Sequence, residues 1–300
     1  MTRTPELARR FFDRFEPVHA VTYFAPEALG ALENLGYRGL GTGYFAARSA
    51  PLGPVPAAVV TALFYNFSPA QVARYLPAAW SVAPPADALR ARLTGAAAAL
   101  RRTGVGTGEQ VSEKAVATAA ALCAKAVGGL DVDGRPLFAA NTALPWPEDP
   151  VEKLWHATTL LREHRGDGHV AALVAAGISG RQANVLHWAA GAVPLEFIKR
   201  SRAYDDAEWH RCVESLCARG LLTADGTLTD AGHELKSDLE ATTDRVALPA
   251  LAALDDDEVE ALFAALTPIT RQVVAGGDVP AGTPMGLRRD ELDDDSAHLG

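Results

Sequence analysis

The sequence contains few of the residues that build disulfide frameworks or structural zinc sites. Its 3 cysteines, Cys123, Cys212 and Cys217, are odd in number and form no Cys-x-x-Cys pair. No histidine lies near them at the spacing of a zinc site, so the pattern speaks against both a disulfide scaffold and a structural zinc. We expect the three thiols to be buried as small apolar side chains.

Long apolar runs and a surplus of positive charge are absent as well. No stretch approaches the roughly 18 to 20 apolar residues of a membrane-spanning helix, and the start, Met-Thr-Arg-Thr-Pro-Glu, lacks the apolar core of a signal peptide. These absences predict a soluble cytoplasmic protein with no membrane partner. The 28 lysines and arginines face 37 acidic residues, and the resulting net charge of −9 is unfavourable for non-specific attraction to phosphate.

The N-terminal half of the chain shows helical periodicity. The 300 residues are 48% hydrophobic, which suffices for two domains or one large domain. The predicted helices cover residues 5–16, 19–35, 39–50, 55–66, 69–80, 84–104 and 108–128. Pro17 is expected to stop the first of them, Gly36 to terminate the second and Ser68 to cap the fifth. Residues 131–149 form a connection that is long for a compact domain, so we predict an N-terminal helical domain at residues 1–148.

The second half predicts a further domain at residues 149–275 and a mobile tail at residues 276–300. A helix starting at Pro150 meets two glycines, Gly166 and Gly168, and each weakens a helix by about 1 kcal/mol relative to alanine. We therefore predict that this helix ends there and that Asp167 caps a second one. After residue 228, helices are expected at residues 229–247 and 255–274, and the tail is rich in Gly, Pro and Asp.

Residues 179–239 read as one compact unit of winged-helix type. Helical segments at 180–190, 194–202 and 205–219 precede two short predicted strands, 221–223 and 227–229, joined by Asp225-Gly226 as the residues with positive φ in a tight hairpin. The stretch Ser215-Leu-Cys-Ala-Arg-Gly-Leu-Leu222 resembles the corresponding region of MarR-type winged-helix regulators. The fold class is therefore expected to be mainly α, with an N-terminal multi-helix domain, a MarR-like winged helix and a short β-hairpin.

Four further segments carry a wider resemblance. They are Pro17-Val-His-Ala-Val-Thr-Tyr-Phe-Ala-Pro-Glu, Gly43-Tyr-Phe-Ala-Ala-Arg-Ser-Ala-Pro-Leu-Gly, Phe64-Tyr-Asn-Phe-Ser-Pro and Arg165-Gly-Asp-Gly-His. In this order, and followed by a winged helix, they resemble the SalK-type helix-turn-helix family of actinobacterial proteins over most of residues 7 to 250. The resemblance implies a MarR-like winged helix and transcriptional regulation, and it supplies no set of catalytic residues.

Electrostatics disfavour DNA as the partner, although the architecture leaves it open. The helix that would enter the major groove begins with Asp205, Asp206 and Glu208, which would lie near a polyanion. The wing, residues 224–227, has no Arg or Lys to reach a minor groove. The candidate DNA-binding residues form one basic cluster with Arg181 near them: Lys199, Arg200, Arg202 and Arg211. The alternative is a solvated face beside a structural turn.

The competing hypothesis places function in a pocket between the two domains. Only 7% of the residues are aromatic, yet many of them fall within residues 19–67, mixed with ionisable groups, as in a small-molecule site. The candidate ligand-binding residues are His19, Tyr23, Phe24, Tyr44, Arg48, Phe64, Asn66, Phe67, Arg165 and His169. His19 and Tyr23 share a helix face, as do Tyr44 and Arg48. The ligand would be apolar or aromatic. As structural alternatives, the tyrosines close core hydrogen bonds and Arg48 pairs with Glu27 or Glu33.

An enzyme of a biosynthetic pathway on a winged-helix scaffold stays the alternative function. Its candidate catalytic residues are His19, Asp167 and His169, because a carboxylate near an imidazole is half of an acid–base arrangement. No Ser or Cys lies in a nucleophile elbow. Metal binding by His164, His169 and His187 fits a helix badly, since the first two are five residues apart. The sequence indicates no metal and leaves the cofactor unknown. Contacts of the later helices could also support a homodimer.

Overall fold

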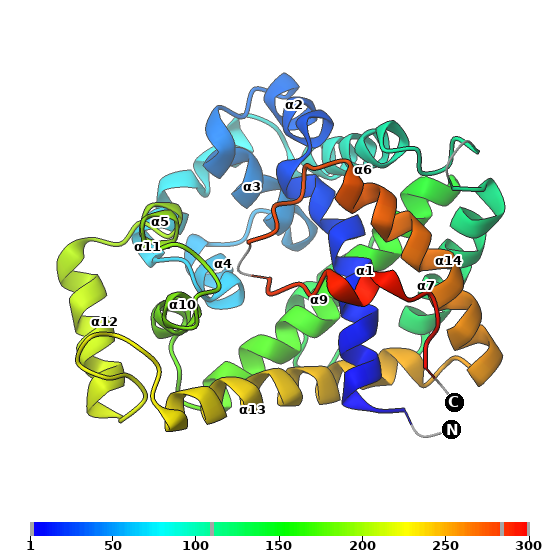
Figure 1. The fold of residues 1–300 in the computed structure, drawn as a ribbon. Helices are drawn as coiled ribbons and strands as arrows, with labels where there is room; N and C mark the ends of the chain where they lie inside the picture. The colour runs from blue at the N-terminus through cyan, green and yellow to red at the C-terminus, as the bar shows by residue number, and fades with distance from the viewer. Residues whose placement is uncertain (1–2, 109–110, 283–284, 299–300) are drawn as a thin grey trace.

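The computed structural model describes residues 3–108, 111–282 and 285–298, and these residues form helices and no sheet (Figure 1). The N-terminal helices are α1 (Pro5–Phe24), α2 (Pro26–Asn34), α3 (Gly39–Ser49), α4 (Ala57–Phe64), α5 (Pro69–Tyr75), α6 (Pro85–Arg102), α7 (Glu113–Gly128) and α8 (Pro136–Thr142). They are followed by α9 (Pro150–Ala175), α10 (Gly180–Ala189), α11 (Leu195–Ser201), α12 (Asp206–Ala218), α13 (Asp230–Ala247) and α14 (Asp256–Ala275). Short 3₁₀ turns lie at Ala50–Leu52, Ala78–Ser81, Leu248–Leu251 and Asp290–Asp293.

Helix α1 runs through the centre of the molecule and is longer than predicted. Every residue from Leu7 to Thr22 is buried, because α6, α9, α13 and α14 all pack against α1. The predicted stop at Pro17 is wrong. A proline inside a helix costs roughly 3 kcal/mol, and burial on all sides offsets this cost. The chain breaks instead before Pro26, which disfavours a helical conformation of Ala25.

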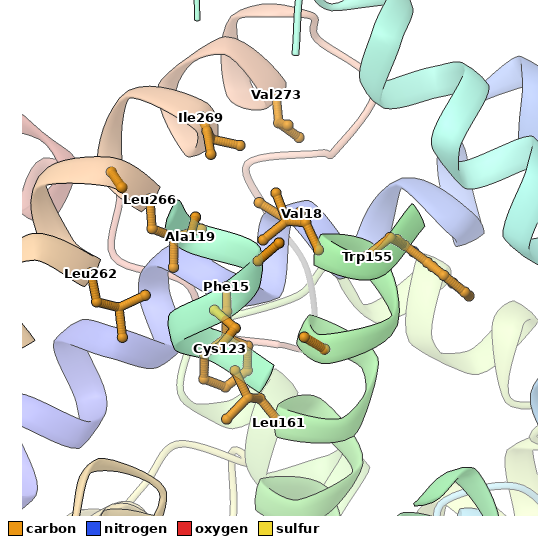
Figure 2. Packing of buried hydrophobic residues seen from close by; sticks show 14 of the residues in the cluster. Phe15, Val18, Ala119, Cys123, Trp155, Leu161, Leu262, Leu266, Ile269 and Val273 are labelled. Atoms are coloured by element: carbon orange, nitrogen blue, oxygen red, sulfur yellow. The ribbon is translucent and has the colours of Figure 1, made fainter. Parts of the chain in front are cut away.

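The main hydrophobic core lies where α1, α7, α9 and α14 meet (Figure 2). Small residues of α7, among them Ala119 and Cys123, are fully buried and let α9 and α14 approach on either side of α7. The core also contains large side chains from the other three helices: Phe15, Val18, Trp155, Leu161, Leu262, Leu266, Ile269 and Val273. The same cluster therefore joins residues from both sides of the predicted boundary at 148/149, and the division into domains stays a prediction.

Helix α9 is continuous across both of its glycines, so the predicted break between residues 162 and 169 is wrong. Asp149 caps α9 by accepting from the backbone N–H of Val151 and of Glu152, both at 3.0 Å. Gly168 is needed for close packing: a Cβ there would lie 2.8 Å from Nη1 of Arg135 and 2.8 Å from Cγ2 of Val246. Tertiary contact thus overrides the low helix propensity of glycine.

Helices α10, α11 and α12 form a separate lobe with its own apolar cluster at one end of the molecule (Figure 1). Ser179 and Gln182 make a capping box at the start of α10. Helix α13 leads away from this lobe and packs against α9 and α1. We call residues 179–229 the helix-turn-helix lobe.

The predicted two-stranded wing is not seen in the part of the chain that the structure describes. Leu222 and Leu228 form an isolated antiparallel bridge, and the N–H of Thr223 donates to the carbonyl of Thr227 at 2.9 Å. Only Gly226 of the expected pair has a positive φ, 84°. The two predicted strands, 221–223 and 227–229, pair at one bridge only, because α12 ends just before the first and Thr229, in the second, already caps α13.

The described part of the predicted tail packs against α1, and Figure 1 shows this C-terminal segment crossing α1. The Arg288 backbone N–H and Nε donate to the two carboxylate oxygens of Asp13, at 3.0 and 2.9 Å. Arg14 in turn donates to the carbonyls of Glu291 and Asp294, at 2.9 and 2.6 Å. None of the helices in the described ranges combines the length and the apolar character needed to cross a membrane.

Candidate functional site

A cavity of about 630 Å³ lies between the N-terminal helices α1–α5 on one side and α9, α10 and α11 on the other. Ligand sites in proteins typically measure about 300 to 1,000 Å³. All of the predicted ligand-binding residues line this cavity: His19, Tyr23, Phe24, Tyr44, Arg48, Phe64, Asn66, Phe67, Arg165 and His169. The structure therefore brings the whole set together, and their binding of a ligand stays a prediction.

One wall of the cavity is aromatic. The ring of Tyr44 lies 6.1 Å from that of Phe64 and 5.6 Å from that of Phe67, measured between centroids. Two guanidinium groups cover this wall: Arg48 lies 4.3 Å from the centroid of Phe64, and Arg202 lies 4.3 Å from that of Phe67. Because a cation is attracted to a ring face, the wall presents apolar surface and positive charge together.

A buried ion network lies deeper in the cavity. The carboxylate of Glu163 accepts from Nε and Nη2 of Arg48, both at 3.2 Å, and from Nη1 of Arg162 at 2.9 Å. Burial alone would raise the pKa of Glu163, but Arg162 and Arg48 hold it well below its usual range. Glu16 lies 3.7 Å from Arg162, and burial raises its pKa to about 7. Glu163 is therefore the charged partner, whereas Glu16 is about half protonated at neutral pH.

His19 and Tyr23 form a hydrogen-bonded pair whose protons can be assigned. The Thr159 hydroxyl donates to the carbonyl of Trp155 at 2.9 Å, so it accepts from Nδ1 of His19 at 3.0 Å. Nε2 of His19 then accepts from the Tyr23 hydroxyl at 2.8 Å. Burial holds the pKa of His19 well below its usual range and raises the pKa of Tyr23. Both groups are uncharged, and the Tyr23 oxygen is left as an acceptor.

The predicted acid–base pair of Asp167 and His169 does not form. The Asp167 carboxylate accepts from the backbone N–H of Phe138, in the first turn of α8, at 2.9 Å and is not among the lining residues. It does not cap a second helix at residue 167, because α9 is continuous. Nδ1 of His169 donates to the Thr243 hydroxyl at 2.9 Å, since that hydroxyl donates to the Leu239 carbonyl. Residues two apart on a helix point in different directions. The enzyme hypothesis thus finds no support in this geometry.

Metal binding is not indicated either. The described residues contain no group of three or more His, Cys, Asp or Glu side chains placed to hold a metal ion. Burial lowers the pKa of His164 to about 3 and that of His187 to about 3, so both imidazoles are neutral. In the segment Arg165-Gly-Asp-Gly-His169, the side chain of Arg165 forms ion pairs with two residues of α13, Asp244 at 2.8 Å and Glu240 at 3.3 Å.

Sequence reasoning missed several residues that shape the cavity. Arg48 pairs with Glu163 and not with Glu27 or Glu33; Glu27 pairs with Arg102. The others line the cavity without having been singled out: Glu16, Arg92, Trp155 and Arg162. Glu16 could have been predicted, because Glu16, His19 and Tyr23 have the spacing of one helix face. The expected helix end at Pro17 placed Glu16 and His19 on different helices, so this spacing was not recognised.

The candidate DNA-binding residues do not form one basic strip. Lys199 is ion-paired with Asp206, and Arg181 is bidentate on Glu208, with distances of 2.6 and 2.8 Å. The side chain of Arg202 lines the cavity. Arg200 and Arg211 are exposed and make no ion pair to a residue that the structure describes. Of these candidates, Arg200 and Arg211 are therefore the ones that are exposed without an ion pair to a described residue, and the first turn of α12 is acidic.

Comparison with protein families identifies the class to which the chain belongs. The profile of a helix-turn-helix family matches residues 8–280, and the chain is a member of this family. The motif that names the family places a recognition helix in the major groove of DNA in many regulators. No curated protein and no solved structure matches the chain.

Proposed function

We propose that this protein is a small-molecule-binding regulator of the helix-turn-helix type, with its ligand in the cavity between the N-terminal helices and α9–α11. The observation that carries the proposal is the lining of that cavity. Aromatic surface from α3, α4 and the loop after α4 meets polar groups from α1, α9 and α10 in a volume suited to a small organic molecule. The ligand is apolar or aromatic in its main part.

The position of the cavity supports a regulatory role. Its lining includes Asn184 of α10 and Phe197 of α11, so an occupant would touch the helix-turn-helix lobe directly. The lobe is also bound to the cavity wall, because Asn184 donates to the Asn66 carbonyl at 2.9 Å. Just before the lobe, the Ile178 carbonyl accepts from the Tyr65 hydroxyl at 2.5 Å. A ligand with different affinity for two positions of this lobe would shift the balance between them.

Two substitutions on α9 test the proposal. Val170 lines the cavity, whereas Val174, one turn further along, is 59% exposed. Val170→Trp should fill part of the cavity and abolish binding of the neutral apolar dye Nile red, measured by fluorescence, and Val174→Trp should leave it unchanged. Native mass spectrometry of the purified protein should show a co-purifying small molecule that Val170→Trp loses. Equal dye binding by both variants would contradict the proposal.

DNA binding is a second candidate because the family is of helix-turn-helix type. Among the candidate DNA-binding residues, Arg200 and Arg211 are exposed and have no ion pair to a described residue. Replacing both by glutamine should therefore weaken binding to all sequences alike and reduce its salt dependence. Gel-shift titrations at two salt concentrations measure both effects. Affinity that is unchanged in the double variant would remove these residues from any DNA contact.

The quaternary structure and the location belong to the same proposal. A homodimer would suit a regulator that reads two half-sites, and sedimentation at several protein concentrations tests for it. The cytoplasmic location stays a prediction from the sequence.

A further inference from the structure

Charge inside the cavity is unevenly paired. Six arginines but four glutamates line it. Glu16, Glu163 and Glu240 each lie within ion-pair distance of a lining guanidinium, and Glu33 is exposed. Three arginines, Arg92, Arg200 and Arg202, are therefore left without an ion pair to any residue in the described ranges. The cavity is cationic inside a chain of net charge −9.

Two of these arginines have other means of stabilisation. Arg92 donates to the carbonyl of Ala47 at 3.1 Å and to Oδ1 of Asn141 at 2.8 Å, and Arg200 is exposed to solvent. Arg202 has neither. Its Nε is buried with no hydrogen-bond partner, and its guanidinium makes no hydrogen bond or ion pair with another described residue. Because burying a donor without a hydrogen-bond partner costs free energy, the unpaired Nε of this half-buried side chain destabilises the protein.

A second unsatisfied group lies beside Arg202. The Asn66 side chain lines the cavity, its Oδ1 is buried without a partner, and its Nδ2 donates to no other described residue. Nη1 of Arg181 donates to the backbone carbonyls of both Asn66 and Arg202, at 3.4 and 2.8 Å, which keeps the two residues adjacent. Phe67 lies against the guanidinium of Arg202. The guanidinium of Arg202, the amide of Asn66 and the ring of Phe67 therefore lie together at the cavity wall.

We infer that the ligand of this cavity is an organic carboxylate: its apolar body lies on Tyr44, Phe64 and Phe67, and its carboxylate accepts from the guanidinium of Arg202 and from Nδ2 of Asn66. The planar guanidinium matches a carboxylate in a bidentate manner. The apolar wall favours a hydrocarbon or aromatic body over a small inorganic anion. This inference rests on the proposed function, because it specifies the chemistry of the molecule in that same cavity.

A matched pair of probes tests the charge requirement. 1-Naphthoate and 1-naphthamide differ in little but the charged group, and each is titrated against Nile red bound to the full chain. We expect the acid to displace the dye at a concentration about 10-fold or more below that of the amide, because hydrogen bonds to a charged group are the stronger ones. Arg202→Gln should abolish this preference while leaving the amide unaffected. Arg202→Lys should keep part of it, and Arg211→Gln, which removes an exposed charge, should keep all of it.

The outcomes separate this inference from the proposed function. Equal displacement by acid and amide in the unmodified protein would overturn the inference alone, as would dye binding that neither probe displaces. A preference that survives in Arg202→Gln would overturn the role of Arg202. Failure of Nile red to bind the unmodified protein, or binding that Val170→Trp leaves unchanged, would overturn the proposed function and the inference with it. The comparison of acid and amide needs no variant, so it decides the question even if Arg202→Gln fails to fold.

Discussion

Replacing Glu163 by glutamine should destabilise the protein by about 3 to 5 kcal/mol, the usual cost of removing one partner of a buried ion pair. The change keeps the shape of the side chain but removes the charge that compensates Arg48 and Arg162, and their remaining carboxylate, Glu16, is only about half ionised at neutral pH. The two carboxylate oxygens accept three hydrogen bonds, at 2.9 to 3.2 Å. In glutamine one of these oxygens becomes an NH2 group that cannot accept, so the bonds to that oxygen are lost and the others go to an uncharged acceptor.

Urea unfolding followed by tryptophan fluorescence measures this loss. The matched control is Glu214→Gln, a change of the same kind at an exposed position of α12, expected to lie within about 0.5 kcal/mol of the unmodified protein. Because the pKa of Glu163 is lowered on folding, its contribution is present above its ordinary pKa of 4.5 and is lost as the pH falls below it. The two proteins should therefore converge in acid. A loss under 1 kcal/mol at pH 7 would contradict the reasoning, because it would show that solvent already screens the charges of Arg48 and Arg162.

Two further predictions follow from buried contacts. The folded pKa of Glu16 is raised to about 7 from 4.5, so its neutral form supports folding fully below pH 4.5 and this support is lost as the pH rises to 7 and above. Glu16→Gln should thus gain stability relative to the unmodified protein by about 2.5 kcal/mol between pH 5 and pH 8; urea unfolding at both pH values would show a constant difference if the reasoning is wrong. Gly180→Ala places a Cβ 1.9 Å from the Tyr65 carbonyl oxygen and should cost about 1 to 3 kcal/mol, with earlier proteolysis in the helix-turn-helix lobe. Gly30→Ala, a helical site with open space around it, should instead stabilise by about 0.5 to 1 kcal/mol, and equal effects of the two changes would refute the steric argument.

Local signals in the sequence predicted those features of the site that depend on local structure. The four-residue spacing of Tyr44 and Arg48 predicted a shared helix face, and Nη1 of Arg48 donates to the Tyr44 hydroxyl at 3.1 Å. The spacing of His19 and Tyr23 predicted their contact equally well. Aromatic density between residues 19 and 67 was enough to locate the wall.

The features that failed were those set by distant parts of the chain. Pro17 and Gly168 are poor helix residues in isolation, and only packing against helices far away in the sequence makes them acceptable. The partner of Arg48 lies 115 residues away, a separation that no spacing rule covers. Arg202 looked like part of a surface patch for phosphate, since its sequence neighbours are cationic, yet the turn after α11 directs it inward.

The guanidinium of Arg181 connects three separate segments of the chain. Its guanidinium is shared between the carbonyl of Asn66 in the loop after α4, the carbonyl of Arg202 at the end of α11 and the carboxylate of Glu208 in α12. The loop after α4, which lines the cavity, and helix α12 are therefore bound to the same planar guanidinium group. If the proposed ligand displaced this loop, the side chain of Arg181 would connect that displacement to α12.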